Sequence, residues 1–115
     1  MRESYGPRER VRKKKDFNEL YGKGVCVRGN YFNLIYLQND LGHSRMAVVA
    51  SRKVGNAVER NRVKRRAKEL FRRNKDELKF PMDLILIAKK DFPGATWRET
   101  RERYFDALRS IRARS

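Results

Sequence analysis

The sequence contains few of the side chains from which enzyme active sites and metal sites are built. Its 115 residues include one cysteine, Cys26, and one histidine, His43. A single cysteine excludes an intramolecular disulfide and a multi-cysteine zinc site, and the histidine has no second histidine as an acid or base partner. Paired carboxylates and glycine-rich phosphate loops are also absent. We therefore expect the isolated protein to be non-catalytic and to bind no metal, and Cys26 to pack as a small apolar residue.

Long apolar runs are absent too. No stretch approaches the roughly 20 apolar residues of a membrane span, and the N-terminus is too polar for a secretory signal. We therefore expect a cytoplasmic protein that does not associate with membranes. The length fits one domain, residues 1–115, in which the basic stretch 1–12 is expected to be flexible. An apolar content of 39% is enough for a core.

Negative charge is scarce between residues 52 and 75. This segment holds eleven Lys or Arg residues against Glu59 and Glu69, so +9 of the formal net charge of +16 lies in about one fifth of the chain. Such a density indicates a nucleic-acid backbone as partner, although a solvated helix face is the alternative. The candidate phosphate ligands are Arg52, Lys53, Arg60, Arg62, Lys64, Arg65, Arg66, Lys68, Arg72 and Arg73, and Asn56 and Asn61 could contact sugars or base edges.

Residue periodicity predicts seven secondary-structure elements in the order α-β-β-β-α-β-α. The first three strands are expected to form a meander, and the nearly continuous apolar strand 82–88 should be central in its sheet. This order predicts an α+β or α/β sandwich with helices on one mixed four-stranded sheet. The expected elements are a helix at 13–21 that ends at Gly22 and Gly24, strands at 25–27, 31–37, 45–50 and 82–88, a helix from the N-cap Asn56 to about Asn74, and a last helix that begins at the Thr96/Glu99 capping box.

The basic helix should have separate apolar and polar faces. A helical wheel groups the apolar positions in one stripe and Asn61, Arg65, Lys68 and Arg72 in a ridge outside it. The stripe is thinnest in the first turns, which suggests that the N-terminal half projects beyond the sheet. The predicted stripe consists of Ala57, Val63, Ala67, Leu70 and Phe71.

A second candidate surface combines Phe17 and Tyr21 of the first helix with one face of the strand 31–37. Alternation places Tyr31, Asn33 and Ile35 on the same side of that strand. If the helix leaves part of the sheet uncovered, this face could bind single-stranded nucleic acid, with bases stacked on rings. Packing in the core is the alternative for Phe17 and Tyr21.

Residues 45–72, RMAVVASRKVGNAVERNRVKRRAKELFR, closely resemble the signature of the bacterial ribonuclease P protein component. The centre of the signature is Arg60-Asn61-Arg62. Other segments occur in the family's order: Lys-Lys-Asp-Phe at 14–17, the Lys-Gly turn, the strand with Tyr-Phe, the strand DLILIA and a C-terminal helix. The resemblance extends over essentially the whole chain.

The resemblance implies a subunit that binds the catalytic RNA of ribonuclease P, the endonuclease that removes 5′ leaders from precursor tRNA. In that family the RNA carries out the cleavage with Mg²⁺, which the RNA mainly binds, and one monomeric protein joins one RNA. Arg60, Asn61, Arg62, Lys64, Arg65 and Lys68 would then face the catalytic RNA, and Phe17, Tyr21, Asn33 and Ile35 would line a leader cleft.

The same resemblance implies an α+β fold similar to domain 2 of ribosomal protein S5. In this fold the basic helix connects two parallel neighbouring strands by a left-handed crossover. Most such connections are right-handed, so the residues alone do not predict this handedness.

Three other functions fit part of the sequence. A ribosomal or assembly RNA-binding protein would have the same charge and aromatic residues but no role in cleavage. A DNA-binding module with the basic helix in the major groove fits less well, because a strand and not a partner helix precedes that helix. An autonomous nuclease lacks an acid/base constellation.

Overall fold

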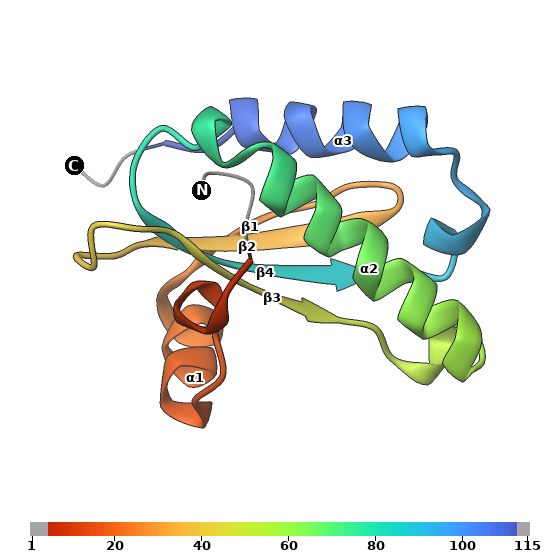
Figure 1. Ribbon diagram of the computed structural model, residues 1–115, viewed down its shortest axis with the longest axis horizontal. Helices are drawn as coiled ribbons and strands as arrows, with labels where there is room; N and C mark the ends of the chain where they lie inside the picture. Colours follow the sequence, from red (N-terminus) through yellow and green to blue (C-terminus); the bar gives the residue numbers. More distant parts are fainter. Residues whose placement is uncertain (1–4, 113–115) are drawn as a thin grey trace.

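The computed structural model describes residues 5–112, which form a four-stranded mixed sheet between helices (Figure 1). The strand order is β1-β2-β4-β3, with antiparallel β1–β2 and β2–β4 pairs and a parallel β3–β4 pair. The predicted α-β-β-β-α-β-α order and the mixed sandwich are confirmed. The elements are α1 (Lys14–Lys23), β1 (Val25–Val27), β2 (Phe32–Gln38), β3 (Arg45–Val49), α2 (Ala57–Arg73), β4 (Met82–Ala88) and α3 (Trp97–Arg109).

The expected meander of the first three strands is wrong. β4 pairs with β2 on one side and with β3 on the other, so β2 and β3 are not neighbours. The central position of β4 was predicted from its apolar sequence, and Leu84, Ile85 and Leu86 are fully buried. The backbone N–H and C=O groups along both edges of a buried strand need a neighbouring strand on each side, and a parallel neighbour must be reached through a crossover, here the one that contains α2. The handedness of this crossover stays a prediction from the family resemblance.

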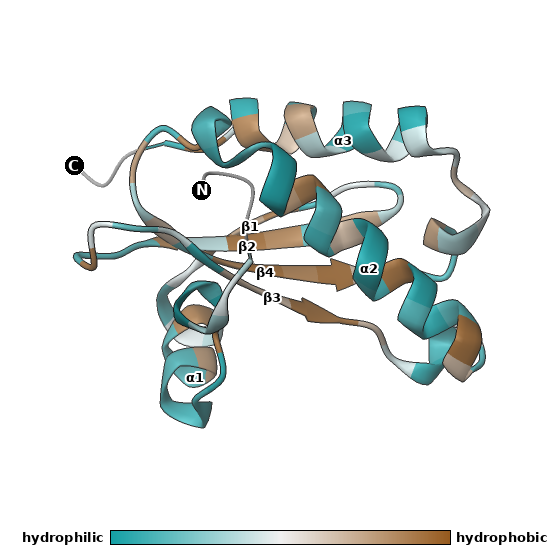
Figure 2. Ribbon diagram, in the orientation of Figure 1, coloured by the Kyte–Doolittle hydropathy of each residue, from teal (hydrophilic) through white to brown (hydrophobic). Residues whose placement is uncertain are grey.

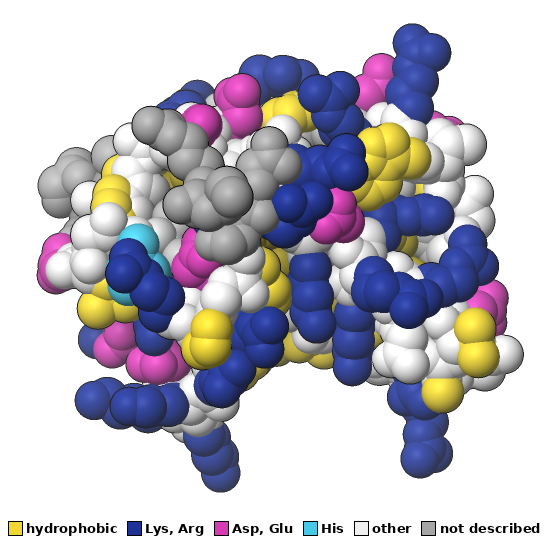
Figure 3. Space-filling view, viewed as in Figure 1, with side chains coloured by type: hydrophobic (Ala, Val, Ile, Leu, Met, Phe, Trp, Pro, Cys, Tyr) yellow, Lys and Arg dark blue, Asp and Glu magenta, His cyan; other side chains and the backbone are white. Residues whose placement is uncertain are grey.

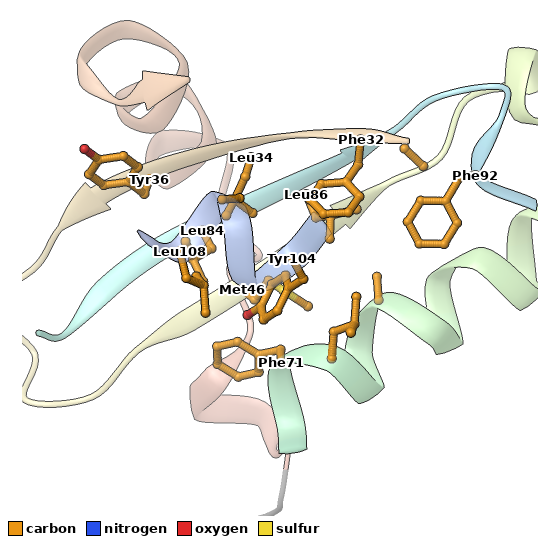
Figure 4. Packing of buried hydrophobic residues seen from close by; sticks show 14 of the residues in the cluster. Phe32, Leu34, Tyr36, Met46, Phe71, Leu84, Leu86, Phe92, Tyr104 and Leu108 are labelled. Atoms are coloured by element: carbon orange, nitrogen blue, oxygen red, sulfur yellow. The ribbon is translucent and has the colours of Figure 1, made fainter. Parts of the chain in front are cut away.

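α2 and α3 cover one face of the sheet and enclose the main core (Figures 1 and 4). Phe32, Leu34 and Tyr36 of β2 alternate toward this face, where Tyr104 and Phe71 meet them from the helices. Figure 2 shows the apolar strands beneath the largely hydrophilic outer side of α2. Of the predicted stripe, four residues are buried, namely Val63, Ala67, Leu70 and Phe71.

The remaining stripe residue, Ala57, is exposed, because it lies at the end of α2 that extends past the sheet (Figure 1). The predicted N-cap is confirmed: Asn56 Oδ1 accepts a hydrogen bond from the Glu59 amide at 3.0 Å, and Glu59 Oε1 accepts one from the Asn56 amide at 3.3 Å. Gly55, at φ 148°, leads into this cap, and a Cβ there would meet the Glu59 carboxylate. The chain therefore requires glycine between the short 3-10 turn Arg52–Val54 and α2.

α1 covers one end of the opposite face of the sheet. Leu20 is fully buried there beside Ile35 and Ile85. The helix runs through Gly22 to Lys23, and Gly24 caps its end by donating its amide to the Leu20 carbonyl at 2.8 Å, so of the two predicted end residues Gly24 is confirmed and Gly22 is not. A Cβ on Gly24 would lie 2.6 Å from Ile35 Cγ2, which shows how closely the helix end approaches β2.

A polar network also joins α1 to the sheet. Arg45 Nε and Nη2 donate to the Asp83 carboxylate at 2.9 and 2.6 Å, and Nη1 donates to Asp16 Oδ2 at 3.3 Å. Asn39 Nδ2 donates to Asp83 Oδ1 at 2.8 Å. The hydrogen bonds from Arg45 to Asp83 raise the pKa of Arg45. Asp83 is 7% exposed, so its carboxylate is a buried charge that depends on these partners.

The N-terminal residues within the described range pack against β3 and α2. Tyr5 Oη donates to the Met46 carbonyl at 2.7 Å, and its ring contacts Phe71 edge-on at 5.6 Å. Lys75 Nζ pairs with Glu9 at 2.6 Å, and Val11 is buried. Of the stretch 1–12 that was expected to be flexible, residues 1–4 lie outside the described residues, Tyr5, Glu9 and Val11 make these contacts, and the flexibility stays a prediction.

Candidate nucleic-acid interface

Lys and Arg side chains lie along much of the solvent side of α2 (Figure 3). The cap and the first turns of the helix are open to solvent, since Asn56, Asn61, Arg62 and Arg65 are exposed. The 3-10 turn that precedes the helix adds Arg52 and Lys53, both exposed. The half-buried members of the predicted set are Arg60, Lys64, Arg66, Lys68 and Arg72.

Some cations of α2 are engaged within the protein and others are not. Arg72 and Arg73 both donate to the Glu69 carboxylate, at 2.7 and 3.0 Å, which lowers the pKa of Glu69. Arg66 Nη1 donates to the Ala95 carbonyl at 2.7 Å, and its burial lowers its pKa, so Arg66 fixes α2 to the segment before α3. Arg72, Arg73 and Arg66 are therefore engaged within the protein.

The other cations of α2, which lie between Arg60 and Lys68, have no such compensation. Among the described residues, no carboxylate pairs with Arg60, Arg62, Lys64, Arg65 or Lys68. Buried Arg60 Nε likewise has no hydrogen-bond partner in the described part of the chain. We call the six residues that include these cations the helix surface: Arg60, Asn61, Arg62, Lys64, Arg65 and Lys68.

The face of the sheet on which α1 lies is only partly covered. Strand register arranges its side chains in rows, and the row Ile35, Ile85 and Ala47 is buried beneath α1. The next row, Asn33, Ile87 and Val49, is half-buried. This row lies toward the carboxyl ends of β3 and β4, the end of the sheet at which α2 begins (Figure 1).

The molecule is hollowed along this side. Figure 3 shows a concave lower edge between α1 and the start of α2, with hydrophobic and basic side chains inside it. Phe17 is half-buried against the cluster that contains Ile35, and Tyr21, four residues later on α1, is 53% exposed. We call the accessible residues the sheet surface: Phe17, Tyr21, Cys26, Asn33, Val49 and Ile87.

The structure distributes the five predicted leader residues over two sides of the sheet. Phe17, Tyr21 and Asn33 belong to the sheet surface, and Ile35, 8% exposed, forms its floor. Tyr31 does not belong to it: its ring packs against the main core and its hydroxyl donates to Glu99 of α3 at 3.2 Å. The alternation of β2 begins only at Phe32, so extending it back to Tyr31 gave the wrong side.

Cys26, Val49 and Ile87 are members of the sheet surface that the sequence did not predict. Cys26 is exposed, which contradicts the expected core position. It pairs with Ile35 in the register of edge strand β1 and therefore faces the same side, outside the cover of α1. The sheet surface could have been predicted only if the strand order were known. Its residues Val49 and Ile87 come from β3 and β4, which are separated in the sequence by α2.

Neither a metal cluster nor a membrane segment emerges from residues 5–112. No group of three or more His, Cys, Asp or Glu side chains in this range could hold a metal ion. No helix within the same range has the length and apolar content to cross a membrane.

Comparisons with known proteins point to one family. A family model described as Ribonuclease P matches residues 6–112. The ribonuclease P protein component of Thermotoga maritima is 34% identical over 115 residues, which cover 96% of this chain and 98% of that protein. The corresponding protein of Syntrophus aciditrophicus is 40% identical over 81 residues, covering 70% and 68%.

Solved structures agree with this result. The RNase P protein from Thermotoga maritima matches with a TM-score of 0.82 at 31% identity, over 91% of this chain and 99% of that one. The RNase P protein of Staphylococcus aureus matches with a TM-score of 0.80 at 30% identity, over 88% and 93%. These values indicate the same mixed sheet with three helices.

Proposed function

This chain belongs to the Ribonuclease P protein family, and from this premise we propose how its two surfaces divide the work of the enzyme's protein subunit. As an RNA-binding component of ribonuclease P, it takes part in tRNA processing. In our proposal the helix surface binds the catalytic RNA and the sheet surface binds the single-stranded 5′ leader of precursor tRNA.

The unpaired charge of α2 supports the first half of the proposal. Five cations without carboxylate partners project from one rigid helix, whose cap is held by the Asn56/Glu59 box. Arg60, Arg62 and Arg65 offer forked donors to phosphate oxygens, and Lys64 and Lys68 offer point charges. Binding a polyanion would release condensed counterions and relieve repulsion within the helix surface. Exposed Arg52, Lys53 and Asn56 extend this binding region, whereas Arg72 contributes less because Glu69 already pairs with it.

The composition of the sheet surface supports the second half. Its half-buried Ile87 and Val49 give an apolar base, Tyr21 and Phe17 give aromatic rings, and Asn33 gives an amide. Aromatic and apolar groups of this kind stack on unpaired bases with little sequence preference, which suits leaders of varied sequence. Double-stranded RNA could not bind in this way, because its bases are stacked on one another inside the duplex.

The single observation on which the proposal depends is that one short segment of chain connects the two surfaces. β3 contributes Val49 to the sheet surface and then leads through the turn Arg52–Val54 into α2. A leader on the sheet surface would therefore lie beside cations that hold the catalytic RNA, and these cations would offset repulsion between the two polyanions.

We propose further that the protein alone does not cleave RNA. Cleavage would be the work of the catalytic RNA and its Mg²⁺, and one protein would bind one RNA in the cytoplasm. No observation favours the alternative of a ribosomal or assembly RNA-binding protein.

Reconstitution tests this proposal. The protein should lower the Mg²⁺ concentration that a bacterial ribonuclease P RNA needs to cleave a leader-bearing precursor tRNA, and it should cleave nothing without that RNA. The proposal fails if the isolated protein cleaves the precursor or if the protein leaves the Mg²⁺ requirement of the RNA unchanged.

A further inference from the structure

An aromatic side chain lies open to solvent on the side of the sheet opposite the sheet surface. Trp97, the chain's one tryptophan, begins α3 and is 37% exposed. It borders a surface pocket of about 530 Å³, a volume within the range of roughly 300–1,000 Å³ typical of small-ligand sites. The pocket lies between the end of α2 and the start of α3 and is lined by Arg73, Asn74, Trp97, Arg98, Arg101 and Glu102.

The backbone beneath Trp97 is fixed by polar contacts. Thr96 Oγ1 accepts a hydrogen bond from the Glu99 amide at 3.0 Å, and Glu99 Oε1 accepts one from the Thr96 amide at 2.9 Å. Arg66 of α2 donates to the Ala95 carbonyl at 2.7 Å, immediately before this cap. Stacking of a ligand on the indole would therefore cost little conformational entropy of the protein, because the backbone there is already ordered.

Three arginines line the same pocket as the indole. Arg98 is 88% exposed, and its contact with Glu102 is long at 3.7 Å. Arg101 lies with Cζ 4.9 Å from the centre of the Phe105 ring, and no carboxylate within the described residues pairs with it. Arg73 is 55% exposed and shares Glu69 with Arg72. The three arginines in the lining exceed the one carboxylate, Glu102, so the pocket favours an anion.

We propose that this Trp97 pocket is a second RNA-binding site, which holds an unpaired nucleotide of an RNA strand. The base stacks on the indole, and Arg98 and Arg101 bind the phosphates on either side of it. An acidic peptide would satisfy the arginines but would leave the open indole face without a planar partner. The site belongs to neither the helix surface nor the sheet surface and lies across the sheet from the latter.

Fluorescence of the single tryptophan reports on this site alone. Titration of the full chain with a single-stranded oligoadenylate of about eight nucleotides, a length in the range of single-strand binding sites, should quench Trp97 emission. Inorganic polyphosphate of equal charge should bind without quenching, because it has no base to stack. AMP should need at least about ten times the nucleotide concentration, since it lacks the neighbouring phosphates.

Three results would overturn the proposal. The first is binding of oligoadenylate, seen by fluorescence anisotropy of a labelled strand, without a change in Trp97 emission. The second is equal quenching of Trp97 by polyphosphate. The last is quenching by AMP at the same nucleotide concentration as the strand. The first would leave RNA only on the other surfaces, and the last would indicate a free nucleotide instead of a strand.

Variants add a measurement that does not use the tryptophan signal. Trp97→Leu should weaken oligoadenylate binding about 5- to 10-fold, in the range of one lost stacking contact. Arg101→Gln should weaken it about 3-fold. The matched control is Arg103→Gln, which removes the same charge from α3 at a residue that pairs with Asp106 and lies outside the pocket, and it should change binding less than about 2-fold. If Arg101→Gln and Arg103→Gln weakened binding equally, the position of Arg101 in the pocket would not matter, and the proposal would be contradicted. Unchanged thermal unfolding shows that each variant is folded.

Discussion

The helix surface and the sheet surface differ in what holds them together. The helix surface lies within nine consecutive residues of one element, so its geometry follows from the helix alone. The sheet surface takes Cys26, Asn33, Val49 and Ile87 from four strands and depends on α1 docking at one end of the sheet. We therefore expect binding at the helix surface to depend on its number of unpaired charges. Binding at the sheet surface should depend on the tertiary structure that leaves this face uncovered.

The largest expected effect separates the two surfaces by breaking the contact of α1 with the sheet. Arg45→Met removes the partner of Asp83 and leaves a buried carboxylate whose remaining donor is Asn39. We expect a loss of about 2 to 3 kcal/mol in the free energy of unfolding, measured by urea denaturation. The preference for leader-bearing over mature tRNA should fall with it, and affinity for the catalytic RNA should change little.

Conservative replacement supplies the control for this prediction. Arg45→Lys keeps a positive charge near Asp83 but loses the pair of hydrogen bonds that the guanidinium donates to the carboxylate. It should therefore destabilise the protein less than Arg45→Met does. A stable Arg45→Met protein that still prefers leader-bearing substrate would contradict the dependence of the sheet surface on this network.

The next effect concerns unpaired charge on the helix surface. The double variant Arg62→Ala/Arg65→Ala should weaken affinity for the catalytic RNA about 10- to 100-fold at low salt and reduce the slope of log K against log salt by about two. The matched double variant Arg103→Ala/Arg109→Ala removes the same charge from α3, where both arginines already pair with Asp106 and lie outside the Trp97 pocket. Filter binding over a salt series distinguishes the two double variants, and equal losses would show that only the net charge of the protein matters.

A smaller effect concerns an exposed ring of the sheet surface. Because Tyr21 is 53% exposed, Tyr21→Ala should leave the free energy of unfolding within about 0.5 kcal/mol of its original value. It should weaken binding of leader-bearing precursor about 5- to 10-fold while leaving mature tRNA unaffected, as expected for one lost stacking contact. Equal weakening of both ligands would assign Tyr21 to contacts outside the leader.

The smallest effect tests the pairing that distinguishes the second half of α2. Arg72 and Arg73 lower the pKa of Glu69, so the folded state holds the carboxylate ionised to lower pH than the unfolded state does. The resulting stability is present above the unfolded pKa and is lost as pH falls through the lower, folded pKa. Glu69 is partly exposed, so Glu69→Gln should cost only a few tenths of a kcal/mol at neutral pH. Urea denaturation between neutral and acid pH should show this difference vanishing at the acid end, and a constant difference would contradict the pairing.

Local features of the sequence predicted the helix surface well. The Asn56/Glu59 cap follows from residue types at a fixed spacing, and the buried stripe from Val63 to Phe71 and the exposure of Asn61 and Arg65 follow from periodicity within one helix. What the sequence did not show is which cations are already paired, because Arg66 finds its partner at Ala95, far along the chain. The exposure of Ala57 likewise depends on where the sheet ends.

Sheet order limited what could be predicted of the second surface. Periodicity identified every strand, but nothing in the sequence of β2 or β3 indicates that β4 lies between them. Without that order, Val49 and Ile87 could not be placed beside Asn33. The error at Tyr31 has another cause, because Tyr31 precedes the first residue of β2, where the alternation of strand side chains does not apply.

Photocrosslinking from the single cysteine tests the division between the two surfaces most directly. Cys26 is exposed on the sheet surface, so a thiol-reactive aryl azide can be attached there without mutation. In a reconstituted complex of protein, catalytic RNA and precursor tRNA, we predict crosslinks from Cys26 to leader nucleotides. The variant Cys26→Ser/Val58→Cys moves the same reagent to the exposed first turn of α2 and should crosslink to the catalytic RNA. Crosslinks from Cys26 to the catalytic RNA alone, with none to the leader, would contradict the account.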